Sequence, residues 1–210
     1  MNNKNQNKGV MLVLSSPSGA GKTSICKSLL GLDRNINLSI SVTTRPIRAG
    51  EKNGEDYIFV DNKTFSKMLK KGDFIEHASV FGHDYGTPKN YVDEKLHKGE
   101  DLLFDIDWQG AQQLRSRMGE DVISVFILPP NKEELEKRLR ERGQDTDTVM
   151  MKRMASASEE ITHWAEYDYV LVNKKLEDSV CNVHNILKAE RLKRIRQTAL
   201  AEFVRSISFD

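Results

Sequence analysis

Residues 9–23 read Gly9-Val-Met-Leu-Val-Leu-Ser-Ser-Pro-Ser-Gly-Ala-Gly-Lys-Thr23, and the prediction of the fold starts from this stretch. Its first seven residues form a continuous apolar run of strand length, which is typical of a strand buried on both faces of a parallel sheet. A glycine-rich turn follows. Apolar residues at Ile25, Leu29 and Leu30 then indicate a helix that ends near Gly31. The stretch predicts the strand–loop–helix unit of an α/β domain.

The turn between this strand and this helix fits the phosphate-loop pattern except at its first position, where Ser16 replaces the expected glycine. Glycines allow backbone N–H groups to converge on phosphate oxygens at a helix N-terminus. The lysine of this pattern reaches the β- and γ-phosphates, and the hydroxyl after it binds Mg²⁺. A glycine-rich turn with an incidental lysine is the weaker alternative. We therefore expect the nucleotide phosphates to bind to Ser16, Pro17, Ser18, Gly19, Ala20, Gly21, Lys22 and Thr23.

Three more apolar runs of strand length occur later in the chain, separated by segments with helical spacing. The runs are Asp101–Ile106, Val122–Leu128 and Tyr169–Val172; the predicted helices cover about 110–117 and Asn131–Gly143. This alternation predicts a three-layer α/β sandwich with a mostly parallel sheet.

Residues 40–99 have short strands and little helix, which predicts a small α+β lobe inserted into one domain over residues 9–207, after a disordered tail at 1–8. Strands are expected at Asn37–Thr43, Tyr57–Val60 and Phe74–Val80, helices at Thr64–Lys71 and Pro88–Lys98, and a turn at Gly82–Tyr85. One long amphipathic helix is expected over residues 177–205.

The composition excludes several classes of protein. With 210 residues, 38% hydrophobic, the chain is not disordered, and its net charge of +1 gives no general attraction to nucleic acid or to a membrane. No apolar run approaches the roughly 18–20 residues that span a bilayer, and two cysteines cannot form a disulfide framework. We expect a cytoplasmic protein. The basic residues of the last helix are better explained as a solvated face than as a nucleic-acid patch.

Two carboxylates, Asp105 and Asp107, follow the strand Asp-Leu-Leu-Phe-Asp-Ile-Asp107. An acid at the carboxyl end of a parallel strand beside a phosphate loop is expected to contact a metal ion or a ligand. We expect Asp105, together with Thr23, to hold Mg²⁺. A cap for the next helix is the less favoured alternative, which Asp107 could also serve.

A second group of phosphate-binding candidates lies between Thr43 and Val60, where Arg45, Arg48 and Tyr57 occur close together. Two arginines three residues apart can bind one phosphate, and a phenol adds another donor. This whole string resembles the guanylate kinase signature. The phosphate loop, FIEHASV, HDYGT, FDIDWQG and the arginines after Pro130 also occur in the order of that family, and the resemblance runs from about Val10 to Asn173. Ser16 and Asp84 are departures from the usual residues.

The resemblance implies a P-loop nucleoside monophosphate kinase with a GMP-binding lobe and a helical lid at about 138–159. The implied reaction transfers the γ-phosphoryl group of ATP to GMP and gives ADP and GDP. The implied contacts to the GMP phosphate are Arg45, Arg48, Tyr57 and Tyr85; those to guanine are Ser41, Glu76, Thr87 and Asp107. The implied contacts to the transferring group are Arg138, Arg142 and Arg153 in the lid, beside Lys22 and Arg45, and Asn173 lies near adenine.

The chemistry of guanine agrees with these positions. A carboxylate such as Glu76 accepts hydrogen bonds from guanine N1–H and N2–H₂, and a hydroxyl such as Ser41 or Thr87 donates to O6. Three alternatives stay open: a non-catalytic guanylate-kinase-like interaction module, a P-loop kinase for another phosphorylated acceptor, and a nucleic-acid-binding protein. The first is disfavoured because Lys22 and the lid arginines are present. The oligomeric state is left open.

Overall fold

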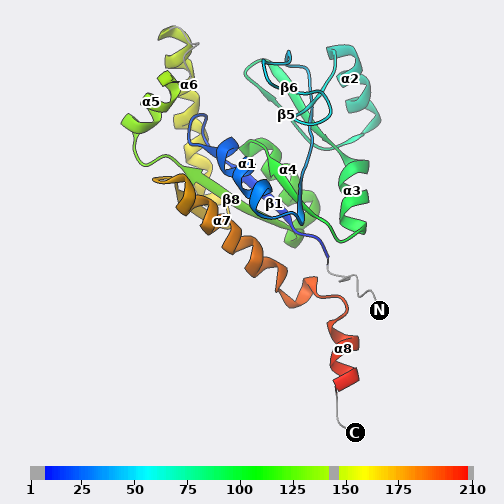
Figure 1. The fold of residues 1–210 in the computed structure, drawn as a ribbon. Helices are drawn as coiled ribbons and strands as arrows, with labels where there is room; N and C mark the ends of the chain where they lie inside the picture. Colours follow the sequence, from blue (N-terminus) through cyan, green and yellow to red (C-terminus); the bar gives the residue numbers. More distant parts are fainter. Residues whose placement is uncertain (1–7, 142–146, 208–210) are drawn as a thin grey trace.

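The computed structural model describes residues 8–141 and 147–207 and is built around a five-stranded parallel sheet (Figure 1). The strand order is β2-β7-β1-β8-β9, with β1 (Met11–Ser15) at the centre between β7 (Asp101–Asp105) and β8 (Val122–Leu128). The edge strands are β2 (Ile36–Leu38) and β9 (Tyr169–Val172). All four pairings are parallel. The predicted parallel sheet is confirmed.

Helices cover both faces of this sheet because successive side chains of β1 point to opposite sides. On one face, Leu12 and Leu14 pack in a buried cluster with α1 (Lys22–Leu32) and α7 (Leu176–Arg191). On the other face, Met11 and Val13 pack with α3 (Lys89–His97) and α4 (Trp108–Met118). The three-layer sandwich expected from the sequence is therefore present.

A second, four-stranded sheet lies beside the first, with the order β4-β3-β6-β5. Its strands are β3 (Val42–Thr43), β4 (Ile58–Phe59), β5 (Phe74–Val80) and β6 (His83–Pro88), and α2 (Asn62–Lys71) packs on it. Val42, Phe65 and Phe74 form its small apolar core. This part of the molecule thus has a core of its own, separate from the two clusters of the parallel sheet.

Two predictions for this region are wrong. The single strand expected at Asn37–Thr43 is two strands, β2 and β3, which belong to different sheets. The turn expected at Gly82–Tyr85 is shorter, because residues 83–88 already form β6. The chain reverses at Phe81 (φ 50°) and Gly82 (φ 79°), and two successive positive φ angles suit the tight hairpin between two antiparallel strands.

Two further helices, α5 (Lys132–Glu141) and α6 (Asp147–Ile161), lie beyond the carboxyl end of β8 (Figure 1). Leu135, Leu139, Met150 and Ala157 form a buried apolar cluster between them. A short 3₁₀ segment, η2 (Thr162–Glu166), follows α6 and leads into β9.

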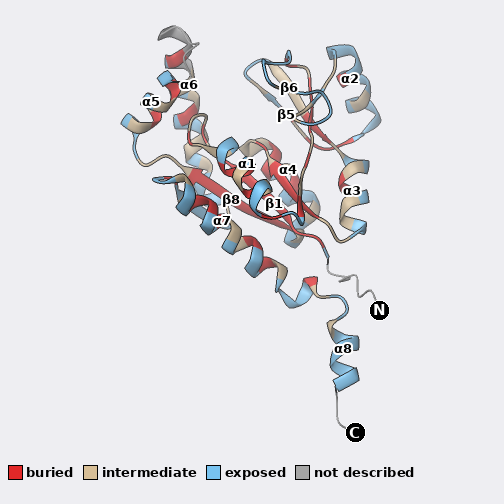
Figure 2. Cartoon of the chain, viewed as in Figure 1, coloured by how far each residue is buried: buried red, intermediate tan, exposed pale blue. Residues whose placement is uncertain are grey.

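The single long helix expected over residues 177–205 is wrong. The chain forms α7, the 3₁₀ turn η3 (Arg194–Arg196) and α8 (Leu200–Ile207). α8 extends away from the body of the molecule and its residues are exposed (Figures 1 and 2). Within the described part of the chain, no helix is long and apolar enough to cross a membrane.

The helix breaks because Arg196 returns the chain to the start of the central sheet. Its side chain is 0% exposed. The guanidinium donates hydrogen bonds to the backbone carbonyls of Gly9 (3.2 Å), Glu120 (3.2 Å) and Asp121 (3.3 Å). The last two residues belong to η1 (Gly119–Asp121), which leads into β8. One buried cation therefore ties the C-terminal segment to the beginnings of β1 and β8.

Replacing Arg196 with methionine should lower the free energy of unfolding by about 3 kcal/mol, because three backbone carbonyls, one of them on the buried Gly9, lose a charged donor. Arg194→Met, on the same 3₁₀ turn but exposed, should change it by less than about 0.5 kcal/mol. Urea denaturation followed by circular dichroism measures both. Equal effects of the two variants would contradict a structural role for the buried guanidinium.

Candidate active site

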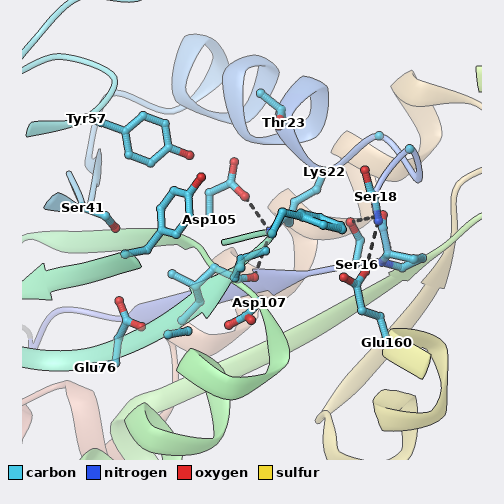
Figure 3. Close-up of a pocket in the computed structure, with 18 residues that line it drawn as sticks. Ser16, Ser18, Lys22, Thr23, Ser41, Tyr57, Glu76, Asp105, Asp107 and Glu160 are labelled. Carbon is cyan, nitrogen blue, oxygen red and sulfur yellow. Dashed lines mark hydrogen bonds and ion pairs between the residues drawn. The ribbon is translucent and has the colours of Figure 1, made fainter. Parts of the chain in front are cut away.

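A pocket opens at the carboxyl ends of β1 and β7 and extends to the second sheet (Figure 3). Its lining comes from four places: the loop after β1 with the start of α1, the end of β7, the smaller sheet and its adjoining residues, and α6. The lining residues are Ser16, Pro17, Ser18, Gly19, Gly21, Lys22, Thr23, Ser41, Tyr57, Glu76, Ala78, Val80, Phe81, Tyr85, Asp105, Ile106, Asp107 and Glu160. The fold thus brings the phosphate loop to one cavity with Tyr57, Tyr85, Ser41 and Glu76, whereas Arg45 and Arg48 do not line it.

The loop between β1 and α1 has the backbone geometry of a phosphate cradle. Gly19 (φ 91°) and Gly21 (φ 99°) adopt left-handed conformations that other residues rarely take. Gly19 also lies against Leu135 and Leu139 of α5, so a Cβ there would be 3.0 Å from both. Ser16 is not among the residues with positive φ, so serine at this position causes no backbone strain.

Lys22, the first residue of α1, is held at the floor of the pocket. Its ammonium group lies 2.8 Å from Asp105 Oδ1 and donates to the carbonyl of Ile106, also at 2.8 Å. Burial alone would lower the pKa of Lys22, but the charge of Asp105 outweighs it and raises the pKa above its ordinary value. The lysine is therefore charged at every physiological pH. Thr23 follows it at the exposed start of α1 and also lines the pocket.

Asn173, the residue that follows β9, is hydrogen-bonded to the phosphate loop. Its amide donates to the carbonyl of Ala20 (2.8 Å) and accepts from the hydroxyl of Ser179 (2.9 Å). The amide nitrogen would be 2.4 Å from a Cβ on Gly21, so the glycine is needed for this close approach. Asn173 is 4% exposed and does not line the pocket. Its expected place near adenine stays a prediction.

Sequence reasoning missed Glu160, which reaches the same loop from α6. Its carboxylate oxygen Oε2 accepts a hydrogen bond from the backbone N–H of Ser18 at 3.2 Å (Figure 3). Burial raises the pKa of Glu160, although Lys22 and the Ser18 N–H oppose the shift. The two partners are 142 residues apart, and Glu160 follows another glutamate in a helix, so no local pattern pointed to it.

At the other end of the pocket, the lining residues Ser41 and Glu76 form a buried polar chain with Thr87, which is 0% exposed and does not itself line the pocket. Thr87 donates to Glu76 Oε1 (2.6 Å), and Ser41 lies 3.2 Å from the same hydroxyl. Burial, with a smaller contribution from the charge of Asp107, raises the pKa of Glu76 to about 7. Gly110 faces the carboxylate closely, since a Cβ on it would be 2.5 Å from Glu76 Oε2.

Asp107 has the capping role that was the alternative in the sequence analysis. It is the N-cap of α4, and its Oδ1 accepts from the backbone N–H of Gly110 at 3.0 Å. Its side chain also lines the pocket, so Asp107 both caps α4 and forms part of the pocket wall.

Arg45 comes two residues after β3, an inner strand of the smaller sheet, and is not a lining residue. The Arg45 guanidinium donates to Glu51 (2.7 Å) and to the carbonyl of Pro46 (2.7 Å), and its carbon Cζ is 5.4 Å from the centre of the Tyr57 ring. Tyr57 and Tyr85 lie edge to face, with ring centres 6.0 Å apart. Burial, with help from the charge of Asp105, raises the pKa of Tyr57 to about 12, so its hydroxyl stays a donor.

The remaining candidates do not line the pocket. Arg48 is exposed. Arg138 of α5 donates to Glu134 (2.9 Å) and to the carbonyl of Asn173 (3.3 Å), and Arg153 lies on α6. Arg142 is outside the described residues, as are residues 1–7 of the expected tail. In the described segments, no three His, Cys, Asp or Glu side chains form a group that could hold a metal by themselves.

Comparison with known proteins agrees with this geometry. The family model "Guanylate kinase" matches residues 8–190. The guanylate kinase of Nitrobacter winogradskyi is 53% identical over 96% of this chain and 92% of the relative, and that of Paramagnetospirillum magneticum is 55% identical over 94% and 92%. A crystal structure of guanylate kinase from Anaplasma phagocytophilum superposes with a TM-score of 0.80, at 42% identity and 96% coverage of both chains. The chain belongs to the guanylate kinase family.

Proposed function

We propose that this chain carries out the reaction of its family, transfer of the γ-phosphoryl group of ATP to GMP, within the pocket described above. The observation that carries the proposal is the joining of two different sites in one cavity. A loop with converging N–H groups and a lysine suits a polyphosphate. A buried carboxylate with two hydroxyls beside it suits a base that presents N–H donors next to a carbonyl.

On the ATP side, we assign the phosphates to the loop from Ser16 to Thr23. The backbone around Gly19 and Gly21 supplies N–H donors, and the dipole of α1 favours negative charge at its N-terminus. Lys22 is already positioned by Asp105 and Ile106 and faces the cavity (Figure 3). A preorganised cation of this kind stabilises charge that develops during transfer without reorganising at that moment.

On the GMP side, we assign guanine to Glu76, Thr87 and Ser41, and the phosphate to Arg45, Arg48, Tyr57 and Tyr85. Adenine has an acceptor at N1 where guanine has a donor, so it would leave the Glu76 carboxylate unpaired. A site built to hydrogen-bond its substrate rejects an analogue that cannot make those bonds by about 10⁴–10⁵ in kcat/KM. We therefore propose residues 40–99 as the GMP-binding lobe.

The reaction does not require a general base. The acceptor is a phosphate oxygen, and a phosphomonoester is largely dianionic near neutral pH, because its second pKa is about 6. The protein must align two polyanions and exclude water. We propose that Arg138, Arg142 and Arg153, in a helical lid at about 138–159, supply the remaining positive charge when the two nucleotides are bound.

The donors near the loop suit Mg²⁺, which is typically bound by one or two carboxylate or hydroxyl oxygens together with substrate phosphates and water. The Thr23 hydroxyl and the Asp105 carboxylate are the groups that would hold it, and both line the cavity. Bound there, the ion would neutralise negative charge on the phosphates of ATP.

The acceptor specificity tests the proposal directly. ADP release, measured in a coupled assay with GMP, AMP, CMP, UMP and dTMP at equal concentrations, should be fast only with GMP. Efficient turnover with another monophosphate would assign the chain to a different acceptor. Absence of turnover with any of them, in a folded protein that binds GMP, would favour a non-catalytic interaction module.

Replacing Lys22 with alanine should lower kcat by about 10²-fold or more, because a preorganised charge at the reacting phosphates is lost. The fold should persist, since the ion pair with Asp105 is partly exposed. Lys27→Ala, an exposed lysine on the same helix, is the matched control and should retain the wild-type kcat. Turnover of Lys22→Ala close to wild type at saturating ATP would contradict the assignment.

The pH dependence of kcat/KM for GMP should contain the ionisation of Glu76. Its pKa of about 7 in the free protein means that the carboxylate loses its charge as the pH falls from 8 to 6, and GMP then loses an acceptor. The wild-type kcat/KM should fall through this range. Glu76→Gln should have a higher KM for GMP and a smaller preference for GMP over AMP.

Glu76→Gln also serves as the control for ionisation of the phosphate group of GMP. GMP phosphate titrates near pH 6 in both proteins, whereas the step near pH 7 should be missing from Glu76→Gln. Superimposable wild-type and variant profiles would show that Glu76 does not contact the base.

A further inference from the structure

We infer that Glu160 is an internal competitor of the ATP phosphates: its carboxylate accepts a hydrogen bond from the phosphate loop, and its displacement by ATP moves α6, the helix that carries Arg153. This inference rests on the proposed role of the loop as the ATP site. Glu160 is then a positioning residue for the reaction, and binding of phosphate in the loop is coupled to the position of α6.

The contact that carries the inference is the hydrogen bond from the Ser18 N–H to Glu160 Oε2, at 3.2 Å. Ser18 lies inside the phosphate loop, and Glu160 lines the same cavity as Lys22 and Thr23 (Figure 3). Backbone N–H groups of such a loop bind anionic oxygens. The carboxylate oxygen therefore takes a place that suits a phosphate oxygen.

Charge makes this occupation competitive. Lys22 attracts Glu160 across the pocket, while Asp107 and Glu159 repel it. A polyphosphate entering the loop would meet the same lysine and the same N–H donor, and one N–H cannot serve both anions fully. Because like charges in a partly buried site repel strongly, the phosphate chain and the Glu160 carboxylate exclude each other.

The position of Glu160 on α6 links this exclusion to the lid. Arg153 and Glu160 are seven residues apart in one helix, which is close to two turns, so they lie on the same face about 10 Å apart. Entering phosphates repel one end of this face and attract the other. The result is a tilt of α6 that withdraws Glu160 and brings Arg153 toward the phosphates.

The apolar contacts of α6 provide a pivot for this movement. Ala157 lies between Arg153 and Glu160 in sequence and is packed with Leu135 and Leu139 of α5. These two leucines also lie against Gly19 of the phosphate loop. The apolar contacts about which α6 would tilt therefore adjoin the phosphate loop itself.

Isothermal titration of the whole protein with ATP tests the competition, because no GMP and no turnover are needed. Glu160→Gln should bind ATP about tenfold more tightly than the wild type, since a charged competitor is replaced by a neutral amide of the same shape. The gain should be present with Mg²⁺ and with EDTA, and inorganic tripolyphosphate should show it too. Glu159→Gln, the exposed neighbour with the same change of charge, should bind each of these within about twofold of the wild type. GMP affinity should be unchanged in both.

Intrinsic fluorescence tests the movement of α6, because the chain has two tryptophans and both report on the end of this helix. Trp108 stacks on His163, with ring centres 3.7 Å apart, and Trp164 is the next residue. ATP should change the emission of the wild type, and nucleotide-free Glu160→Gln should already show part of that change. Glu160→Asp, one methylene shorter, should behave like a weaker version of the glutamine variant.

The outcomes separate this inference from the proposed function. Failure of the wild type to bind ATP would overturn the role of the loop itself. A wild type that binds ATP, with Glu160→Gln binding it equally or more weakly, would overturn the competition alone. Weaker binding only in the presence of Mg²⁺ would instead make Glu160 a group that supports the metal ion.

Discussion

The ion pair between Lys22 and Asp105 is the interaction on which the site depends. It joins the residue that opens α1, just after β1, to the end of the neighbouring strand β7, and it holds the ammonium group toward the cavity at 2.8 Å from the carboxylate. This placement requires parallel strands, because only then do both carboxyl ends meet at one edge of the sheet. The third strand end at this edge, β9, supplies Asn173, which fastens the loop through Ala20.

The second requirement is that two anionic substrates be recognised in one cavity by different chemistry. The phosphate end uses backbone N–H groups and a lysine that is charged at every physiological pH. The other end uses the buried chain of Ser41, Thr87 and Glu76, whose carboxyl has a pKa of about 7. The smaller sheet has its own apolar core, but β5, which carries Glu76, is also fastened to the parallel sheet. Ile75 packs in the buried cluster of that sheet, and the backbone of His77 is hydrogen-bonded to Gln113 of α4.

The parts of the fold that the sequence predicted well are those with a strong local pattern. The apolar runs predicted β8 and β9 with the observed bounds, as did the short strand expected at Phe74–Val80 for β5, and the glycine spacing identified the phosphate loop. The division of Asn37–Thr43 into strands of two sheets could not be predicted, because alternation of apolar and polar residues is the same in either sheet. The break after α7 depends on Arg196 and carbonyls more than 70 residues away in sequence.

The site, like the fold, combines features that have a local sequence pattern with contacts between distant segments that have none. The loop and its lysine have a local signature, whereas the contact of Glu160 with Ser18 joins segments 142 residues apart and has none. The guanine-binding assignments came from resemblance to the family and not from spacing. The structure adds that Ser41, Thr87 and Glu76 are hydrogen-bonded to one another and buried, which no pattern in the sequence contains.

In the proposed reaction, one cavity aligns ATP and GMP for direct transfer and excludes both water and AMP as acceptors. The most direct measurement follows the γ-phosphate itself, with γ-labelled ATP and equimolar unlabelled GMP and AMP, and the products separated by chromatography. The label should appear in GDP, and almost none should appear in inorganic phosphate or in ADP. Label released mainly as inorganic phosphate, or shared with ADP formed from AMP, would contradict the proposed reaction.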